Sequence, residues 1–352
     1  MSKQIEDNND LVRLEDSATE STPCLLCGSN AIFRKTQKGY QEPYTFKIYY
    51  CESCNTSFSL PRVKSNKVYE LIYKNPLAVK GYKRYQNYQE QVITKKDPLN
   101  FLENLEPSYW GAIHAIKNVL QVDKSAHIIE VGSGLGYFTY SLKTAGYNIQ
   151  GLDISQEAVN DAKKKFGNYY LCDDLFNFAE HNSESYDLVI MTEVIEHLDD
   201  PKEFLKTINR ILKPNGKLIT TTPNKSFYPN KISWYTDFPP VHCWWFSEKS
   251  IEYIAGLLNM KLKFVEFEDY HKKHPFISKI VNLDSEGDFI FDSLGNVIEK
   301  QNIKTNNLEM PKWLKKNKLY IYLRNFLFES LYPKIYKSGG VQSNVICAIL
   351  YK

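Results

Sequence analysis

Between His127 and Phe267 the chain alternates short apolar runs with segments whose apolar residues recur every three or four positions. The runs predict buried strands, whereas the longer spacing predicts amphipathic helices. Strands are predicted at 127–131, 147–153, 169–175, 186–191, 217–224 and 261–267, and a last run at 344–351 predicts one more. Strands that alternate with helices indicate an α/β fold, with a parallel sheet and helices on both of its faces.

The first predicted strand ends in Glu130, and three glycines follow at alternate positions, Gly132, Gly134 and Gly136. Helical composition resumes at Tyr137, so the stretch predicts a strand, a tight loop and a helix. Such a loop presents backbone N–H groups to a ligand. A dinucleotide-binding fingerprint would need glycine in place of Tyr137, and its pyrophosphate would lie beside the charge of Glu130. A ligand that carries an ammonium group suits this loop better.

Acidic residues also end the next two predicted strands. Asp153 ends the second strand, and the third ends at Asp173 or Asp174, two positions between which the sequence does not choose. Any one of these acids is equally well explained as a helix cap or a solvated turn. Because the carboxyl ends of successive parallel strands meet at one edge of a sheet, three acids there predict a shared binding site.

The sequence around the glycines resembles motif I of class I S-adenosylmethionine (SAM) methyltransferases. The stretch from Glu193 to Leu198, with the later 222–224, is similar to ubiquinone-biosynthesis O-methyltransferases and their bacterial relatives. The resemblance covers residues 125–268 and the last strand. It implies a Rossmann-like seven-stranded sheet in which the last strand is an antiparallel edge strand. The resemblance identifies the cofactor, SAM, specifically, but it gives little information about the acceptor.

The resemblance also implies which residues hold SAM. Asp153 would accept hydrogen bonds from both ribose hydroxyls, and Asp173 or Asp174 would meet the adenine amine. The full set of implied cofactor contacts is Glu130, Gly132, Ser133, Gly134, Gly136, Tyr137, Asp153, Ile154, Asp173, Asp174, Leu175 and Glu193.

Four of the seven cysteines form two Cys-x-x-Cys pairs near the N-terminus, Cys24 with Cys27 and Cys51 with Cys54. Two thiolates on each of two turns close a tetrahedral structural zinc site that has no open position. Strand-like sequence between the pairs, at 45–50, fits a zinc ribbon. Exposed thiols in unliganded pairs would oxidise, so zinc ligation in a reducing compartment is the favoured interpretation.

A second cluster, Glu193, Glu196 and His197, follows the predicted fourth strand, and His242 lies in a later loop. On a helical turn, the first three side chains would share one edge of the active site. With His242 they resemble the metal site of small-RNA 3′-end 2′-O-methyltransferases, which implies Mg²⁺ or another divalent ion beside the attacking hydroxyl. Alternatively, the carboxylates position the cofactor or the loop backbone while His197 or His242 acts as a general base, or the cluster is purely structural. These four are the candidate catalytic residues.

The predicted organisation has six parts: a disordered tail at 1–20, a zinc ribbon at 21–62, a helical lid or linker at 63–122, a SAM-binding core at 123–269, an insertion that caps the substrate at 270–340, and a final core strand at 341–352. The lid is rich in tyrosine, which indicates either a substrate-lining surface or a helix packed on the core. The insertion carries a basic aromatic segment at 312–337. That segment indicates a surface for a diphosphate-linked sugar, an RNA backbone or a membrane, or simply a packed helix.

Composition narrows the function less than the motifs do. The 352 residues carry a formal net charge of +3, so total charge gives no case for a nucleic-acid partner, although it does not exclude one. No apolar run is long enough to span a membrane, and the polar start has no signal pattern. A cytoplasmic protein is therefore expected.

The leading hypothesis is a SAM-dependent O-methyltransferase that acts on a hydroxyl of a small polar acceptor, a sugar or nucleotide-linked sugar. The alternatives are a metal-dependent RNA 2′-O-methyltransferase, a sugar C-methyltransferase, a quinone or phenol O-methyltransferase, and a non-catalytic methyltransferase-like scaffold. The chain partly resembles deoxysugar C-methyltransferases with zinc ribbons, but the stretch 193–197 departs from them. The intact glycine loop and Asp153 count against a scaffold, which does not need them.

Overall fold

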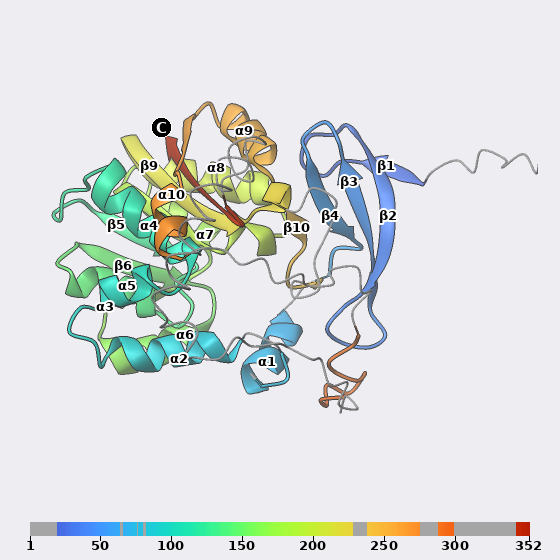
Figure 1. Cartoon of the computed structure of the whole chain (residues 1–352), viewed down its shortest axis with the longest axis horizontal. Helices are drawn as coiled ribbons and strands as arrows, with labels where there is room; N and C mark the ends of the chain where they lie inside the picture. Colours follow the sequence, from blue (N-terminus) through green and yellow to red (C-terminus); the bar gives the residue numbers. More distant parts are fainter. Residues whose placement is uncertain are drawn as a thin grey trace, which may run out of the picture.

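The structure is a computed structural model, and it describes residues 20–63, 66–75, 77–79, 82–227, 238–274, 288–298 and 343–352. These residues form two β-sheets, a seven-stranded sheet flanked by helices and a five-stranded sheet beside it (Figure 1). The predicted α/β class is confirmed. Within the described part of the chain, no helix is both long and apolar enough to cross a lipid bilayer.

The larger sheet has the strand order β11-β12-β9-β8-β5-β6-β7. Strands β5 to β9 are parallel wherever they pair, whereas β12 is antiparallel to both of its neighbours. This is the predicted Rossmann-like seven-stranded sheet. Its strands are β5 (Ile128–Val131), β6 (Ile149–Asp153), β7 (Tyr170–Cys172), β8 (Tyr186–Thr192), β9 (Leu212–Pro223), β11 (Lys261–Phe264) and β12 (Val345–Tyr351).

Three predicted details of this sheet are wrong. The last strand, β12, is antiparallel as expected, but it lies between β9 and β11, so that β11 is the edge strand. The third strand, β7, ends at Cys172, because the Asp174 carboxylate caps the next helix by accepting the N–H of Phe176 at 2.8 Å. The strand predicted at 217–224 begins earlier, at Leu212 of β9, and residues 213–216 form an irregular stretch inside it, where the pairing with β8 shifts register and Asn215 has a φ of 65°.

Helices cover both faces of the larger sheet (Figure 1). One face buries α4 (Pro107–His114), α5 (Tyr137–Thr144) and α6 (Gln156–Phe166), and the other buries α7 (Leu175–His181), α8 (Pro201–Ile211) and α9 (Glu248–Leu257). Serine side chains cap the start of two of them. The Ser155 hydroxyl accepts the N–H of Ala158 at 3.2 Å, and Ser247 and Ser250 form a capping box on α9. Local cap chemistry therefore fixes where these loops give way to helices.

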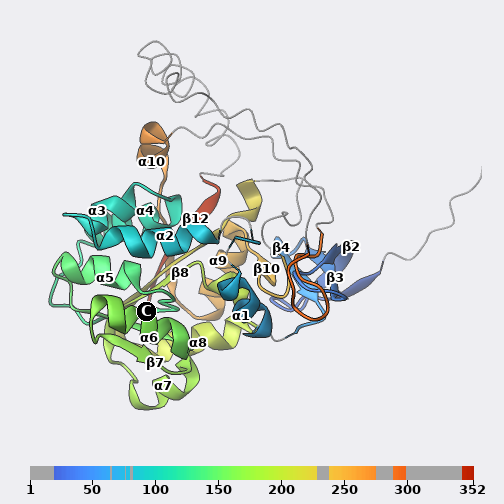
Figure 2. The same ribbon diagram turned by 90° about the horizontal axis from the view of Figure 1, so that it is seen from below.

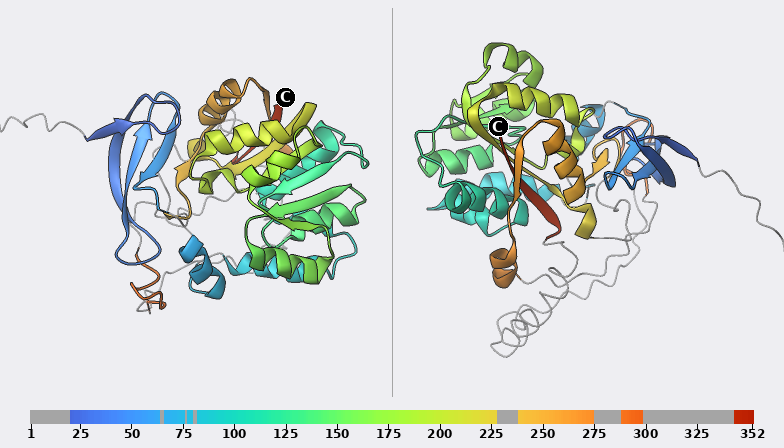
Figure 3. Two further views of the ribbon diagram at one scale, coloured as in Figure 1. Left: turned by 180° about the vertical axis from the view of Figure 1, so that it is seen from behind. Right: turned by 90° about the horizontal axis from the view of Figure 1, so that it is seen from above.

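The smaller sheet has the order β1-β2-β3-β4-β10, and four of its strands come from the predicted zinc ribbon. They are β1 (Ser21–Pro23), β2 (Asn30–Lys38), β3 (Thr45–Cys51) and β4 (Thr56–Leu60), and we call them the ribbon. The fifth strand, β10 (Trp244–Trp245), arrives from the core and pairs antiparallel with β4. Figure 3 shows the ribbon on one side of the core. The two parts of the chain therefore share a sheet.

The predicted lid contains α1 (Asn66–Lys74), α2 (Lys83–Val92) and α3 (Pro98–Glu103), and a π-helical turn (Ala115–Val119) follows α4. Figure 2 shows α1 between the core and the ribbon. On α2, Tyr85 and Tyr88 pack edge to face, and Tyr88 packs in the same way on Tyr109 and Tyr137 of the core. This stripe is packed on the core, and its use as an acceptor surface stays a prediction.

Two predicted segments lie largely outside the described residues. Of the tail, the structure describes only Glu20, whose carboxylate forms an ion pair with Lys47 of the ribbon at 2.8 Å. Of the insertion, it describes the end of α10 (Glu268–Lys273) and residues 288–298, which bridge to the loop between β2 and β3. The basic aromatic segment at 312–337 lies outside the described residues.

Candidate active site and cysteine cluster

The glycine loop joins β5 to α5 in a conformation that side chains disfavour. Gly132, Gly134 and Gly136 have φ values of 78°, 48° and 78°, in the left-handed region. A Cβ atom at Gly132 would lie 2.6 Å from Cγ2 of Val194, and one at Gly136 would lie 2.7 Å from Cβ of Ala162. The loop therefore lies directly against the segment that follows β8.

Ser133 and Tyr137, the other two loop residues expected to contact the cofactor, are both buried. The Tyr137 hydroxyl lies against the hydroxyl of Tyr109, which fixes the start of α5. The Ser133 hydroxyl has no hydrogen-bond partner among the described residues. Buried hydroxyl groups are normally hydrogen-bonded, so the Ser133 hydroxyl suits a contact with a bound ligand.

Glu130 ends β5 as a buried carboxyl group, only 2% exposed. It accepts a hydrogen bond from the Thr139 hydroxyl on α5. Burial raises the pKa of Glu130 from 4.5 to about 8, against the lowering effect of hydrogen bonds from Thr139 and Thr192. The carboxyl group is therefore mostly protonated at neutral pH until a cation approaches it.

Asp153 ends β6 with both carboxylate oxygens bonded to nearby backbone. Oδ2 accepts the N–H of Gly134 at 2.7 Å, and Oδ1 accepts the N–H of Ser155 at 2.8 Å. Burial raises the pKa of Asp153, although these bonds oppose the shift. A carboxylate oxygen has two lone pairs, so each oxygen can accept a further hydrogen bond. Asp153 thus braces the glycine loop and can still accept a pair of ligand hydroxyls.

The residues expected around the adenine differ in their surroundings. Ile154 is 71% exposed directly after β6, whereas Leu175 is buried in the core. The Asp174 carboxylate is engaged as the cap of α7. The Asp173 carboxylate accepts the N–H of Asp174 at 2.8 Å and has lone pairs left for a ligand. Of the two acids that the sequence left open, Asp173 is therefore the better placed for an adenine amine.

Glu193 follows β8 in a left-handed conformation, with a φ of 56° that is uncommon for a residue other than glycine. Its N–H donates to the carbonyl of Thr221 at 3.1 Å. Burial raises the pKa of Tyr85 on α2, and the negative charge of Glu193 is one of the charges that raise it further. Backbone strain of this kind tends to occur at functional sites. Glu193 nevertheless does not join the cluster formed by the three other candidate catalytic residues.

Glu196, His197 and His242 do come together. The 3₁₀ turn η2 (Ile195–His197) carries the first two, and His242 comes from the loop before β10. One ligand atom from each of the three lies within 4.8 Å of the others. Glu196 is 1% exposed, and its Oε2 accepts the Thr222 hydroxyl at 2.9 Å. A carboxylate buried to this extent is normally paired with a cation or a protonated group.

His197 is oriented through Nδ1, which lies 2.8 Å from the carbonyl oxygen of Val241 and 3.0 Å from the Tyr69 hydroxyl. Because a carbonyl oxygen can only accept, Nδ1 carries the proton in that bond, and the ring lone pair is on Nε2. Nε2 lies 3.9 Å from Oε1 of Glu196. Proteins orient imidazole ligands and bases in this way.

His242 is neutral at physiological pH. Burial and, after it, the positive charge of Arg84 lower the pKa of His242 to about 3. Arg84 belongs to α2, where it pairs with Glu106 at 2.9 Å and donates to the Tyr85 hydroxyl at 2.8 Å. A neutral imidazole offers a lone pair to a metal ion or a proton. Through the charge of Arg84, helix α2 therefore acts on the cluster of Glu196, His197 and His242.

Sequence reasoning missed four supporting residues: Tyr69, Arg84, Thr139 and Thr222. Tyr69 and Arg84 lie in the stretch where tyrosines alternate with lysines and arginines, which was the one available signal. Their position near the histidines depends on how α1 and α2 pack, which no local pattern encodes. Thr139 reaches Glu130 from α5 and has no sequence signature, whereas Thr222 reaches Glu196 from β9 and lies in the stretch 222–224, which the resemblance had singled out without a role for this residue.

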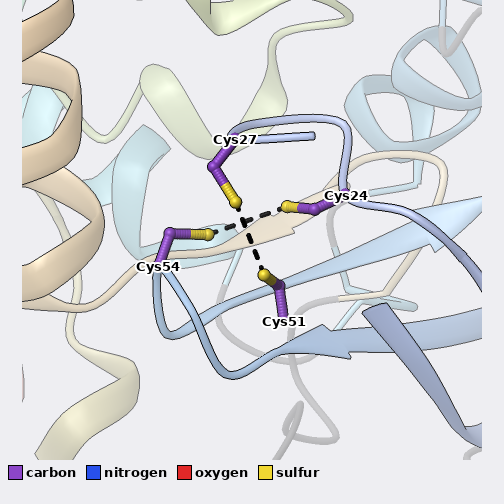
Figure 4. Close-up of side chains that lie close together, drawn as sticks. All are labelled: Cys24, Cys27, Cys51 and Cys54. Atoms are coloured by element: carbon purple, nitrogen blue, oxygen red, sulfur yellow. Dashed lines mark hydrogen bonds between the residues drawn. The ribbon is translucent and has the colours of Figure 1, made fainter. Parts of the chain in front are cut away.

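The four predicted zinc ligands also come together. Figure 4 shows their sulfur atoms pointing to one centre, with Sγ separations of 3.7 Å for Cys24 and Cys54 and 3.5 Å for Cys27 and Cys51. None of the four forms a disulfide. Four sulfur atoms at about 2.3 Å from a tetrahedral Zn²⁺ would be about 3.8 Å apart. The cluster therefore fits a closed structural zinc site.

Comparison with known proteins relates the middle of the chain to methyltransferases. Residues 107–261 match a family described as methyltransferase domain, and the match begins with α4. The ubiquinone biosynthesis O-methyltransferase of Coxiella burnetii (strain RSA 493) is 28% identical over 156 residues, which cover 39% of this chain and 66% of that protein. The mitochondrial ubiquinone biosynthesis O-methyltransferase of Homo sapiens is 34% identical over 108 residues, covering 28% of this chain and 29% of that protein.

These matches leave much of each protein uncovered, because the chain spans 66% of the length of the bacterial relative. Among solved structures, a SAM-dependent methyltransferase from Archaeoglobus fulgidus is 16% identical, with 73% of this chain and 100% of that chain covered. The TM-score is 0.42, so that likeness carries no weight beside the strand order and the glycine loop.

Proposed function

Because residues 107–261 form a class I SAM-dependent methyltransferase domain, we propose that this chain transfers a methyl group from SAM to a hydroxyl oxygen. One observation carries the proposal. The segment after β8 contacts the glycine loop through Val194, beside Gly132, and only two residues later it presents Glu196 and His197. Groups suited to cofactor binding and groups suited to proton transfer are therefore adjacent.

In this proposal Glu130 meets the ammonium group of SAM, and Asp153 accepts the ribose hydroxyls. Asp173 accepts the adenine amine, while the exposed side chain of Ile154 covers an apolar face of the base. SAM supplies an electrophilic methyl group on a sulfonium. As the acceptor oxygen forms its bond to the methyl carbon, the sulfur–methyl bond breaks and S-adenosylhomocysteine remains.

The cluster of Glu196, His197 and His242 takes the acceptor proton. A neutral hydroxyl is a weak nucleophile, and Nε2 of His197 carries the lone pair that can accept its proton. Two imidazoles and a carboxylate are also a donor set for a divalent ion, which would stabilise the alkoxide. The ribbon in turn would hold one structural Zn²⁺ at its four cysteines.

The proposal is tested by calorimetric titration of the purified protein with S-adenosylhomocysteine, beside elemental analysis for zinc. We expect binding and one zinc per chain. Absence of cofactor binding under every condition would refute the methyltransferase function and favour the scaffold alternative.

Mn²⁺ titration followed by electron paramagnetic resonance shows whether the cluster of Glu196, His197 and His242 holds a divalent ion or acts only as a base. A site lost in Glu196→Gln identifies a divalent centre. If no Mn²⁺ binds and EDTA leaves methyl transfer unchanged, the histidines act as bases alone.

Cofactor affinity is expected to rise with pH between about 6 and 8. In the empty site burial raises the pKa of Glu130 to about 8, so the carboxyl group must lose its proton when the ammonium group binds beside it. Proton release on binding strengthens binding as pH rises, by at most about tenfold per unit, and the effect ends above the empty-site pKa. Titrations of S-adenosylhomocysteine across this range measure the slope. Glu130→Gln, which cannot ionise, should show a flat profile.

The acceptor class is settled by a transfer assay with radiolabelled SAM and a panel of catechols, nucleotide-linked hexoses and RNA 3′ ends. The printed name of the ubiquinone-biosynthesis relatives supports transfer to oxygen. The sugar acceptor stays a prediction from the sequence. The RNA alternative drew on the resemblance of the stretch 193–197 to an RNA methyltransferase metal site, on the ribbon, and on the basic segment at 312–337, which lies outside the described residues.

A further inference from the structure

The loop that carries His242 runs directly into β10, and β10 belongs to the sheet of the ribbon (Figures 1 and 3). We propose that the ribbon, with its Cys51–Cys54 turn closed by the bound ion, is the element that positions His242 beside Glu196 and His197. The proposal rests on the proposed function for the role of the cluster. It assigns the cysteine site a task in the active site beyond holding the ribbon together.

Cys243, the residue after His242, forms hydrogen bonds through both its backbone carbonyl oxygen and its backbone N–H. Its carbonyl oxygen accepts the N–H of Ser59 at 3.1 Å and Nη1 of Arg62 at 3.3 Å, both from the end of β4 and the residues just beyond it. Its own N–H donates to the carbonyl oxygen of Glu196 at 2.9 Å. The backbone of one residue, Cys243, therefore links the ribbon to the turn that carries the other two members of the cluster.

Trp244 continues this link with its side chain. It is 2% exposed, and it pairs with Phe58 across the β10–β4 ladder, with ring centroids 5.8 Å apart. Its indole Nε1 donates to the carbonyl oxygen of Leu198 at 2.8 Å, just after η2. The Arg62 guanidinium lies 4.3 Å from its ring centroid. The apolar interior of the ribbon is thus continuous with one face of the core, and Trp244 lies at the junction.

The second cysteine turn contacts the chain just beyond β10 as well. The Thr56 hydroxyl lies 3.2 Å from Sγ of Cys54 and donates to the Ser250 hydroxyl on α9 at 2.7 Å. The Ser250 hydroxyl in turn donates to the carbonyl oxygen of Cys54 at 3.1 Å. Nζ of Lys225, a residue only 6% exposed, donates to Oδ1 of Asn55 at 3.0 Å. The turn is therefore docked on the core around β10.

These contacts predict a selective effect of the ion. Ion binding to thiolates supplies folding free energy, so its removal loosens the Cys51–Cys54 turn and the ladder between β4 and β10. The His242 loop then loses its anchor. The cofactor residues at the ends of β5 and β6 follow strands on the far side of β8 and β9, so their geometry persists.

The experiment removes the ion from the full-length, zinc-loaded protein with a thiol-specific mercurial and a chelator, then restores it with reductant and Zn²⁺. Hydrogen exchange of residues 241–246 is followed by mass spectrometry. We expect exchange to accelerate by about 100-fold on removal and to recover on restoration. S-adenosylhomocysteine affinity, measured in parallel, should change by less than about threefold. Carbethoxylation of His242 should accelerate as well, with the exposed His181 as internal reference.

A mild variant covers the case in which removal of the ion unfolds the chain. Thr56→Val keeps all four cysteines and removes the hydroxyl that reaches Ser250, so it should retain zinc and still speed exchange at 241–246 by about fivefold. Thr36→Val, at an exposed position of β2, is the matched control and should leave exchange unchanged. Unchanged exchange and unchanged His242 reactivity, both after ion removal and in Thr56→Val, would overturn the proposal. Failure to bind the cofactor or to transfer a methyl group would instead count against the proposed function.

Discussion

Replacing His242 with alanine is expected to lower the rate of methyl transfer about 10³-fold, the range that general-base catalysis by the cluster or its metal equivalent contributes. The reason is geometric, because His242 lies with Glu196 and His197 in one cluster, with ring centroids of the two histidines 4.3 Å apart. Affinity for S-adenosylhomocysteine should stay within about twofold, since the cofactor residues follow other strands. Single-turnover transfer to the acceptor found in the screen measures the first effect, and calorimetry measures the second.

The matched control is His181→Ala, which removes an exposed histidine at the end of α7 and should leave both quantities unchanged. Added imidazole should partly rescue the His242 variant if the side chain works as a base, and should fail to do so if it holds an ion. A loss of transfer smaller than about tenfold would contradict a role in proton transfer.

Replacing Asp153 with alanine is expected to weaken S-adenosylhomocysteine binding about 100-fold. The carboxylate braces the glycine loop through the N–H of Gly134 at 2.7 Å, and in the proposed complex it also accepts the ribose hydroxyls. Charge-assisted hydrogen bonds contribute about 1.5 to 3 kcal/mol each, so losing two of them costs about 3 kcal/mol at the lower end of this range, which corresponds to about 100-fold in affinity. Calorimetry measures the change, and Glu157→Ala on the exposed side of α6 is the control.

A ligand lacking the ribose 3′-hydroxyl separates the two roles of Asp153. It should bind the wild-type protein about tenfold more weakly than S-adenosylhomocysteine, yet bind the Asp153 variant with nearly the same affinity as S-adenosylhomocysteine. If the missing hydroxyl costs the same in both proteins, Asp153 braces the loop and does not contact the ribose.

Much of the fold follows from local patterns. The strands, the glycine loop and the caps at Ser155 and Ser247 were all predictable, because each depends on residues within one turn or one strand. The two cysteine pairs were predictable for the same reason, since each pair lies on a single turn. The seven-stranded Rossmann-like sheet followed only from the family resemblance, which named the wrong edge strand.

The errors arose where distant segments meet. The position of β12 inside the sheet depends on β11 pairing beyond it. The two strands differ in the sequence, because β11 alternates lysines with apolar residues whereas β12 is apolar throughout, but the family resemblance had placed β12 at the edge. Strand β10 is two residues long, too short for any periodicity, and its partner β4 lies far away in the sequence. Glu193 and Glu196 have the right spacing for one helical face, but the left-handed backbone at Glu193 ends that regularity.

The strand that completes the larger sheet is also the last of its strands to be synthesised. Val345 of β12 pairs with Pro223, far earlier in the chain, and on its other side β12 pairs with β11. Until β12 exists, β9 and β11 each present an unpaired row of N–H and C=O groups. A nascent chain therefore holds complete cofactor-binding strands, β5 to β8, next to two open sheet edges. The strands that carry the cofactor-binding residues are therefore synthesised well before the strand that closes the sheet.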